Sequence, residues 1–182
     1  MLPRHATTAV VALALMATAG ATTPAVLGPP WISIEYPVNP YDRDARDAYL
    51  VVHTFHHQVP TGLPVSGRAE GLVSGVRRTV ALSFGTTSRS SDYTLRQQWP
   101  QEGSWVLVIE SKQGEGEFNR VTALVDIGRD GRVSGVRVPT VRNREGYQVP
   151  AAVTTADVDA ALARVSQPVG TRGTGGRLIS TV

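Results

Sequence analysis

Hydrophobic and polar residues alternate along most of the chain between residues 31 and 138, which is typical of β-strands buried on one face. In the first such run, Ile32, Ile34 and Tyr36 are separated by single polar residues, and Pro37 ends the alternation. Similar patterns predict seven further strands, at residues 49–55, 65–73, 76–84, 93–99, 105–109, 121–127 and 133–138. These strands predict a mainly β protein.

The last two predicted strands give the clearest signal for how the strands connect. They flank residues 128–131, where Asp130-Gly131 supplies the left-handed backbone that a hairpin turn needs. Earlier strands are also separated by turn-forming segments, such as the Pro- and Gly-containing stretch at 58–64. Short strands joined by such turns predict an antiparallel sandwich or barrel.

A change of pattern near the C-terminus predicts one short helix. Thr154 is a suitable N-cap, and Asp157 places negative charge in the first turn. Val158, Leu162 and Val165 then share one face at helical spacing. The Gly/Thr-rich residues that follow predict a flexible tail.

The beginning of the chain has the three parts of a secretory signal peptide. Arg4 and the α-amino group form a positive start, residues 7–17 are uncharged and mostly apolar, and Ala19 and Ala21 form a small-x-small cleavage motif. These features predict cleavage before Thr22. We therefore expect an exported protein that works in the periplasm or outside the cell.

The alternative is a retained N-terminal membrane anchor. A spanning helix needs about 20 predominantly apolar residues, and here Pro24, Pro29 and Pro30 interrupt the uncharged stretch. We therefore expect no stable membrane span after cleavage. The predicted signal peptide, linker, β-domain, short helix and flexible tail cover residues 1–21, 22–30, 31–150, 151–166 and 167–182.

The chain contains no cysteine, which narrows its chemistry. Disulfides stabilise many small secreted domains, so this domain must rely on its hydrophobic core. The absence also excludes thiol catalysis, Cys-ligated zinc, iron–sulfur centres, attached c-type haem and a lipid-modified cysteine.

The charge of the chain argues against a nucleic-acid partner. It has 18 basic residues against 15 acidic ones, and its arginines are scattered along the sequence. Nucleic-acid binding requires a concentrated basic face. We therefore predict no nucleic-acid partner.

All histidines after the predicted cleavage site lie in the segment His53-Thr54-Phe55-His56-His57. Imidazole suits copper and zinc, so His53, His56 and His57 are candidate metal ligands. In a strand, however, His53 and His57 would lie roughly 13 Å apart, whereas a Zn–N bond is only ~2.0–2.1 Å long. We therefore favour strand-end histidines with polar neighbours, and keep a copper or zinc site completed from elsewhere as the alternative.

The sequence contains no G-x-S-x-G nucleophile motif and no glycine-rich phosphate loop. The acidic loop at 42–47 fails the calcium-loop pattern, because Arg46 and Asp47 occupy its fifth and sixth positions. A solvated, ion-paired loop is expected there instead. We therefore predict no catalytic residue, no cofactor and no enzyme activity. A hydrolase with an unrecognised site stays open as an alternative.

Two tryptophans flank the turn at 100–104, an arrangement that can form an aromatic platform for a sugar or peptide. Trp105 alternates with its neighbours as a core residue would. Only Trp99 is therefore kept as a candidate ligand platform.

Four segments carry a resemblance to a known class of domain. They are an early strand at 49–53, a Pro/Gly turn leading into 63–67, Ser-Asp-Tyr-Thr-Leu at 91–95, and the run at 99–109. The last is similar to a "Y-x-(5–8)-P-x-G-x-W-x-L-x-V" end. In these segments the chain resembles exported bacterial immunoglobulin-like modules of the YtkA-like and CopC-like kind, and also carboxypeptidase-regulatory-like domains.

The resemblance implies an accessory or binding role rather than an activity. With the strand pattern, it leads us to expect a mainly β fold: an antiparallel immunoglobulin-like β-sandwich of about seven to eight strands, with one short C-terminal helix. CopC-like copper sites use an N-terminal histidine, whereas the predicted mature chain begins at Thr22. Copper binding is therefore not implied by the resemblance.

The sequence therefore predicts a non-enzymatic, exported binding or accessory module of the cell envelope. Its expected partner is a protein or another envelope component, and no pattern in the chain sets its oligomeric state. The first alternative is a copper- or zinc-binding envelope protein that uses His53, His56 or His57. The second is a hydrolase.

Overall fold

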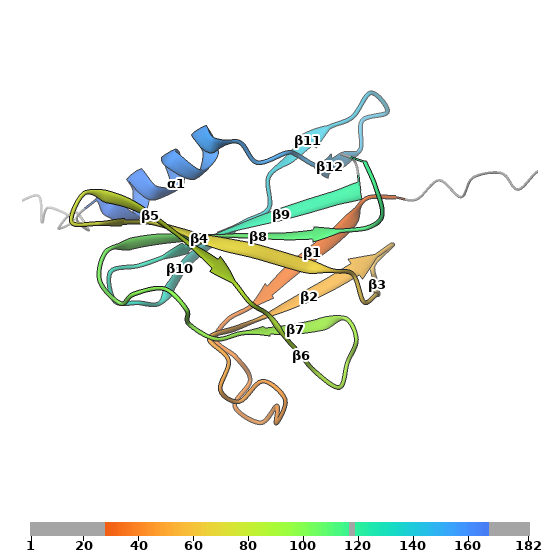
Figure 1. Cartoon of the computed structure of the whole chain (residues 1–182). Coiled ribbons are helices and arrows are strands. Elements are labelled where there is room, and N and C mark those ends of the chain that lie inside the picture. Colours follow the sequence, from red (N-terminus) through yellow and green to blue (C-terminus); the bar gives the residue numbers. More distant parts are fainter. Residues whose placement is uncertain (1–27, 117–118, 168–182) are drawn as a thin grey trace, which may run out of the picture.

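The computed structural model describes residues 28–116 and 119–167 (Figure 1). The predicted signal peptide at 1–21, the predicted linker up to residue 27 and the predicted tail from residue 168 lie outside the described residues. The described part is mainly β with one helix, as the sequence predicted.

The first antiparallel sheet, sheet A, has the strand order β1-β2-β7-β6. These strands span Pro30–Glu35, Leu50–His56, Asp92–Leu95 and Gly85–Thr86. A two-residue strand, β3 (Val59–Pro60), pairs with the end of β2.

The second antiparallel sheet, sheet B, has the order β10-β9-β8-β4-β5. Its strands span Val133–Arg137, Arg120–Ile127, Ser104–Lys112, Val65–Val73 and Val76–Leu82. The predicted hairpin between β9 and β10 is confirmed. Gly131 has a φ of +74° and donates its N–H to the carbonyl of Gly128 at 2.9 Å.

The two sheets share one hydrophobic core. Both contribute fully buried side chains, because each strand turns alternate residues toward the other sheet. The buried members of this core are Ile32, Leu50, Val52 and Leu95 from sheet A, Ala69, Leu82, Trp105, Leu107, Ile109, Val121, Ala123, Val125 and Ile127 from sheet B, and Trp99 from the loop between the sheets.

The single described helix, α1 (Thr155–Ser166), covers the other face of sheet B (Figure 1). Its start is fixed by the predicted cap, since the side chain of Thr154 accepts from the N–H of Asp157 and the Asp157 carboxylate accepts from Thr154 in return. A second apolar cluster joins helix to sheet. It consists of Val106, Val108 and Leu124 from the sheet and Val158, Ala161, Leu162 and Val165 from the helix.

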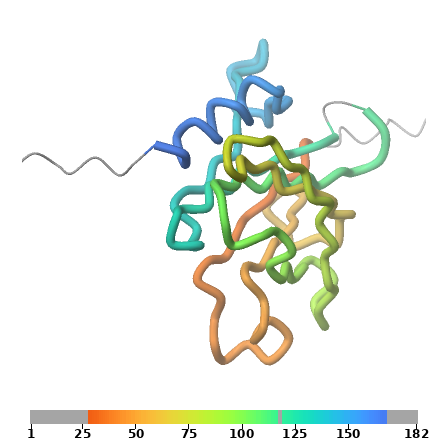
Figure 2. The backbone as a smooth tube through the Cα atoms, turned by 60° about the vertical axis from the view of Figure 1, so that its left-hand side comes forward, coloured from red at the N-terminus to blue at the C-terminus, as the bar shows by residue number. Residues whose placement is uncertain are grey.

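A two-stranded hairpin forms a third, separate sheet. It consists of β11 (Thr140–Arg142) and β12 (Gln148–Pro150), and we call residues 140–150 the arm. The arm and the loop at 37–48 lie at opposite ends of the molecule in both views (Figures 1 and 2). A hydrogen bond from the N–H of Ala151 to the carbonyl of Pro139, 2.9 Å long, closes its base.

The strand count differs from the prediction of seven to eight. The described residues contain twelve strands, and the four that were not predicted, β3, β6, β11 and β12, are only two or three residues long. Such short strands carry no measurable alternation, so the periodicity could not reveal them. Among the residues described, no helix has the length and apolar character that crossing a bilayer requires.

Candidate functional site

His53 is the most constrained of the predicted site residues. It lies on the outer face of sheet A, because Leu50 and Val52 of the same strand turn toward the core. Its Nδ1 is 3.0 Å from Oδ1 of Asp92, and its Nε2 is 3.0 Å from Oε2 of Glu35. The imidazole is therefore held between two carboxylates.

Strand register brings these three side chains together. Asp92 in β7 and Ser33 in β1 are the direct cross-strand partners of His53, one on each side. Glu35 lies two residues beyond Ser33 and so shares its face, which makes it a diagonal neighbour of His53. The cluster therefore follows from the order β1-β2-β7.

A doubly protonated ring would allow both contacts of His53 to be hydrogen bonds to ionised carboxylates. A neutral imidazole has one N–H, whereas an ionised carboxylate can only accept hydrogen bonds. Both carboxylates therefore receive a hydrogen bond only when both ring nitrogens carry a proton. In that state the imidazolium joins β1 to β7 across β2 by two charge-assisted hydrogen bonds.

Asp92 extends the cluster toward the loop at 37–48. Burial raises the pKa of its carboxyl, but hydrogen bonds from Arg89, His53 and Ser91 outweigh burial and lower the pKa below the ordinary value. Arg89 also donates to Asp42 at 2.5 Å. The guanidinium thus links the buried carboxylate of β7 to the exposed loop.

The loop at 37–48 makes further polar contacts. Asp44 accepts from the N–H of Ser88 at 2.9 Å, and Glu35 accepts from the N–H of Asn39 at 2.9 Å. Neither of these two contacts is an ion pair. The ion pairs of the loop are made with arginines outside it, Asp42 with Arg89 and Asp47 with Arg96. Polar contacts with residues of sheet A and of the segment before β7 therefore hold this loop in place.

The same cluster bears on the hydrolase alternative, because it places a serine and two carboxylates around a histidine. In a Ser-His-Asp triad the histidine lies between the serine and the aspartate. Here Asp92 lies in the middle, accepting from both Ser91 Oγ at 2.9 Å and His53. The other nitrogen of His53 is occupied by Glu35. This order leaves no imidazole nitrogen to take a proton from Ser91.

His56 and His57 lie apart from this cluster, at the turn that follows β2. Their ring centroids are 4.1 Å apart, and His57 has a φ of +49°. Nε2 of His56 is buried and has no hydrogen-bond partner among the described residues. Within those residues, no three His, Cys, Asp or Glu side chains are arranged to hold a metal ion. The three-histidine metal site stays a prediction.

Both tryptophans are buried, whereas a ligand platform would need an exposed ring. Trp105 belongs to the core, as expected, and its Nε1 donates to the carbonyl of Glu102 at 2.8 Å. Trp99 is only 5% exposed and packs edge-on against Tyr49, with ring centroids 5.0 Å apart. The structure places Trp99 in the core, so its role as a ligand platform would need a change in packing, and it stays a prediction.

The arm is a feature that the sequence did not predict. Its turn is fixed by Asn143, whose Oδ1 accepts from the N–H groups of Glu145 and Tyr147 at 3.1 and 2.9 Å. Tyr147 is 67% exposed and Val141 is 52% exposed. The arm thus presents apolar groups on an ordered hairpin.

The basic groups of the arm lie beside these apolar ones. Arg142 donates from Nη1 to the carbonyl of Gly146 at 2.9 Å, and Arg144 is exposed at the turn. Tyrosine and arginine are enriched among the residues that contribute most to protein–protein binding. The one sequence signal that could have predicted the arm is the turn-forming segment Asn-Arg-Glu-Gly at 143–146, which is followed directly by Tyr147.

We compared the chain with protein-family models, curated proteins and solved structures, and none of the three comparisons gives a significant match.

Proposed function

We propose that this protein is an exported, non-enzymatic binding module with an immunoglobulin-like β-sandwich fold, and that it binds a protein of the cell envelope through the arm. The fold assignment is supported by two antiparallel sheets that share one core. Export is supported by the signal-like pattern of the first 21 residues. The mass of the mature protein recovered from the producing cells should correspond to a chain beginning at Thr22.

The arm is the observation that carries the binding role. Tyr147 and Val141 are large apolar side chains that are exposed rather than packed in either core cluster. Tyr147 is held at the turn by Asn143, and Val141 is held in β11 by its pairing with Val149. Both are exposed on the hairpin that carries Arg142 and Arg144. Glu145 is also exposed at this turn, so the arm carries two basic groups and one acidic group beside its apolar ones. A surface of this kind suits a partner that presents an apolar patch beside acidic groups.

Site-specific photocrosslinking in the producing cells tests this proposal. A photoreactive phenylalanine analogue replaces Tyr147 in one variant and Tyr41 in a control. Tyr41 is also an exposed tyrosine, but it lies in the loop at the opposite end of the molecule. We expect a discrete crosslinked protein from position 147 only. No crosslink at 147, or the same products from both positions, would contradict the proposal.

Metal binding is a second candidate, and one observation favours it. The imidazoles of His56 and His57 are in contact, and Nε2 of His56 has no partner among the described residues. Copper(II) or zinc could bridge this pair, whereas both nitrogens of His53 are occupied.

Calorimetric titration of the mature protein with Cu(II) and Zn(II) tests this second candidate. A His56→Ala/His57→Ala variant should lose binding, and a His53→Ala variant should keep it. If the wild-type protein binds neither metal more tightly than the double variant does, the candidate is wrong.

A further inference from the structure

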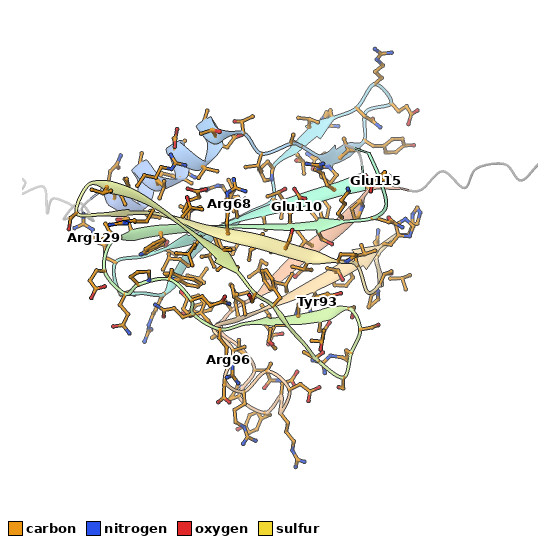
Figure 3. All side chains as sticks on the ribbon, in the orientation of Figure 1. Arg68, Tyr93, Arg96, Glu110, Glu115 and Arg129 are labelled. Carbon is orange, nitrogen blue, oxygen red and sulfur yellow. The ribbon has the colours of Figure 1, made fainter. Side chains whose placement is uncertain are left out.

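A polar cavity of about 260 Å³ lies on the outer face of sheet B, next to α1. Its floor comes from β4, β8 and β9, and its rim includes Ala152 and Val153, which lead from the arm to the helix. Figure 3 shows Arg68 and Glu110 projecting from this side of the sheet. We call it the Arg68–Arg120 pocket.

Two guanidinium groups line this pocket from strands on either side of β8. Arg68 comes from β4 and Arg120 from β9, and β8 runs between them. Nε of Arg68 donates to Oε1 of Glu70 at 2.7 Å. Glu70 also accepts hydrogen bonds from Arg77 and Thr79, which hold its carboxylate in place. The contact with Glu70 therefore fixes the Arg68 side chain along the sheet. It uses only Nε of Arg68 and leaves the two terminal nitrogens of the guanidinium for another acceptor.

Arg120 has unused hydrogen-bonding capacity. Its Nε is buried and has no hydrogen-bond partner among the described residues. Its Nη1 lies 3.7 Å from Oε2 of Glu110, which is beyond hydrogen-bond distance. A buried donor on a charged group that lacks an acceptor is destabilising, so an added acceptor would gain a charge-assisted hydrogen bond.

The remaining polar groups form a row across the floor. Ser66, Glu110 and Thr122 are cross-strand neighbours on β4, β8 and β9, and all three line the pocket. Each guanidinium already lies beside a carboxylate, Arg68 beside Glu70 and Arg120 beside Glu110, so a ligand carboxylate would be held by the nitrogens that these pairs leave unused. Glu110 in turn offers an acceptor for a hydrogen-bond donor on the ligand.

We propose that the Arg68–Arg120 pocket binds a small carboxylate that also carries an amino or hydroxyl group. The carboxylate lies between the two guanidinium groups, and the donor of the ligand faces Glu110. The cavity is smaller than the ~300–1,000 Å³ typical of sites for drug-sized ligands, so it fits a molecule of only a few heavy atoms. This site is separate from the arm and does not depend on the arm's role.

Amide chemical-shift titrations of the mature protein test the proposal, with glycine, lactate, acetate and methylammonium as probes at constant ionic strength. We expect saturable shifts confined to β4, β8 and β9, with glycine and lactate binding more tightly than acetate. Methylammonium should not bind. Shifts that are spread over the surface, or that chloride produces equally, would overturn the proposal.

Three variants separate the pocket from general charge effects. Arg68→Gln and Arg120→Gln should each weaken glycine binding at least tenfold, while Glu110→Gln should weaken glycine but not acetate. The control is Arg96→Gln, since Arg96 lies in the loop between the sheets with its side chain 74% exposed. Thermal unfolding confirms that each variant is folded. If Arg96→Gln weakens binding as much as Arg120→Gln, the pocket is not the site.

Discussion

Gly71 in β4 and Trp105 in β8 are direct cross-strand partners, and the indole of Trp105 fills the space that a side chain at position 71 would occupy. A Cβ built on Gly71 would lie well inside the van der Waals distance of Cε3 of Trp105. Trp105 is fully buried and donates to the carbonyl of Glu102, so its ring cannot move aside. The core of sheet B therefore requires glycine at this position.

Gly71→Ala should lower the free energy of unfolding by about 1–3 kcal/mol, the usual cost of inserting a methyl group into a packed core. Gly71 has no positive φ in this structure, so the effect comes from the contact with Trp105. Urea unfolding followed by tryptophan fluorescence measures it. Gly135→Ala is the matched control, because a Cβ there meets Asp126 only at 3.7 Å and beyond. Equal losses in both variants would contradict this explanation.

His53→Ala should destabilise the protein by about 1–3 kcal/mol, because the ring's 3.0 Å contacts with Asp92 and Glu35 are both lost. The loss is limited, since Arg89 and Ser91 still donate to Asp92. Denaturant unfolding at pH 6 is the measurement.

A double-mutant cycle shows whether this loss belongs to the cluster. His53→Ala combined with Asp92→Asn should cost less than the sum of the single changes, because both remove the same contact. His57→Ala serves as the control, since the side chain of His57 is exposed and joins no ion pair among the described residues. Additive losses in the cycle would show that His53 and Asp92 act independently.

The strands themselves could be predicted from the sequence where one face is buried and the other is polar. β8 shows where this pattern fails: Val106 and Val108 point away from the shared core and are still buried, because α1 covers them. The apolar run at 105–109 therefore predicted that a strand exists, but not that β8 extends from Ser104 to Lys112. At β5 the predicted strand ran to Phe84, whereas it ends at Leu82.

The candidate sites depend on information that local patterns do not hold. Glu35 and Asp92 lie 18 and 39 residues from His53 in sequence. They meet only because β2 lies between β1 and β7, and nothing in the spacing of residues gives that order. The pocket likewise needs β8 between Arg68 and Arg120. The arm escaped prediction for a different reason, since its exposed Val141 and Tyr147 give no buried face.

Acid should destabilise the protein through two buried carboxylates, Asp92 and Glu70. Burial raises the pKa of each, but the hydrogen bonds that each accepts outweigh burial, so both pKa values are lowered in the folded state. Because these pKa values are lower in the folded state, the unfolded chain binds protons more readily than the folded protein does. The stabilisation is therefore complete above the ordinary carboxyl range and is lost as the pH falls below about 4.

Asp92→Asn should flatten the loss of stability between pH 4 and pH 2, although the variant is less stable than wild type at pH 7. Unfolding by urea at several pH values measures the slope. Asp47→Asn is the control, because its carboxylate is 74% exposed and only loosely paired, 3.5 Å from Arg96. An unchanged slope in Asp92→Asn would mean that another group causes the acid sensitivity.

Alkaline pH should destabilise the protein through Tyr49. Burial raises the pKa of its phenol well above the ordinary value, and the negative charges of Tyr36 and Asp130 add to the effect. The hydroxyl also donates to the carbonyl of Gly131 at 2.7 Å, a contact that only the neutral phenol can make. Because the folded pKa is raised, the stabilisation is present below about pH 10 and is lost as the pH rises further.

Tyr49→Phe separates the two contributions of this phenol. At pH 7 the variant should be less stable by about 0.5–1.5 kcal/mol, because the hydrogen bond to Gly131 is lost. Between pH 10 and pH 11.5 its stability should fall less steeply than that of wild type, since no half-buried phenol remains to be ionised at this position. Tyr41→Phe is the control, because its side chain is 90% exposed and folding does not bury it. If Tyr49→Phe and wild type lose stability in parallel above pH 10, ionisation of the Tyr49 phenol is not the cause.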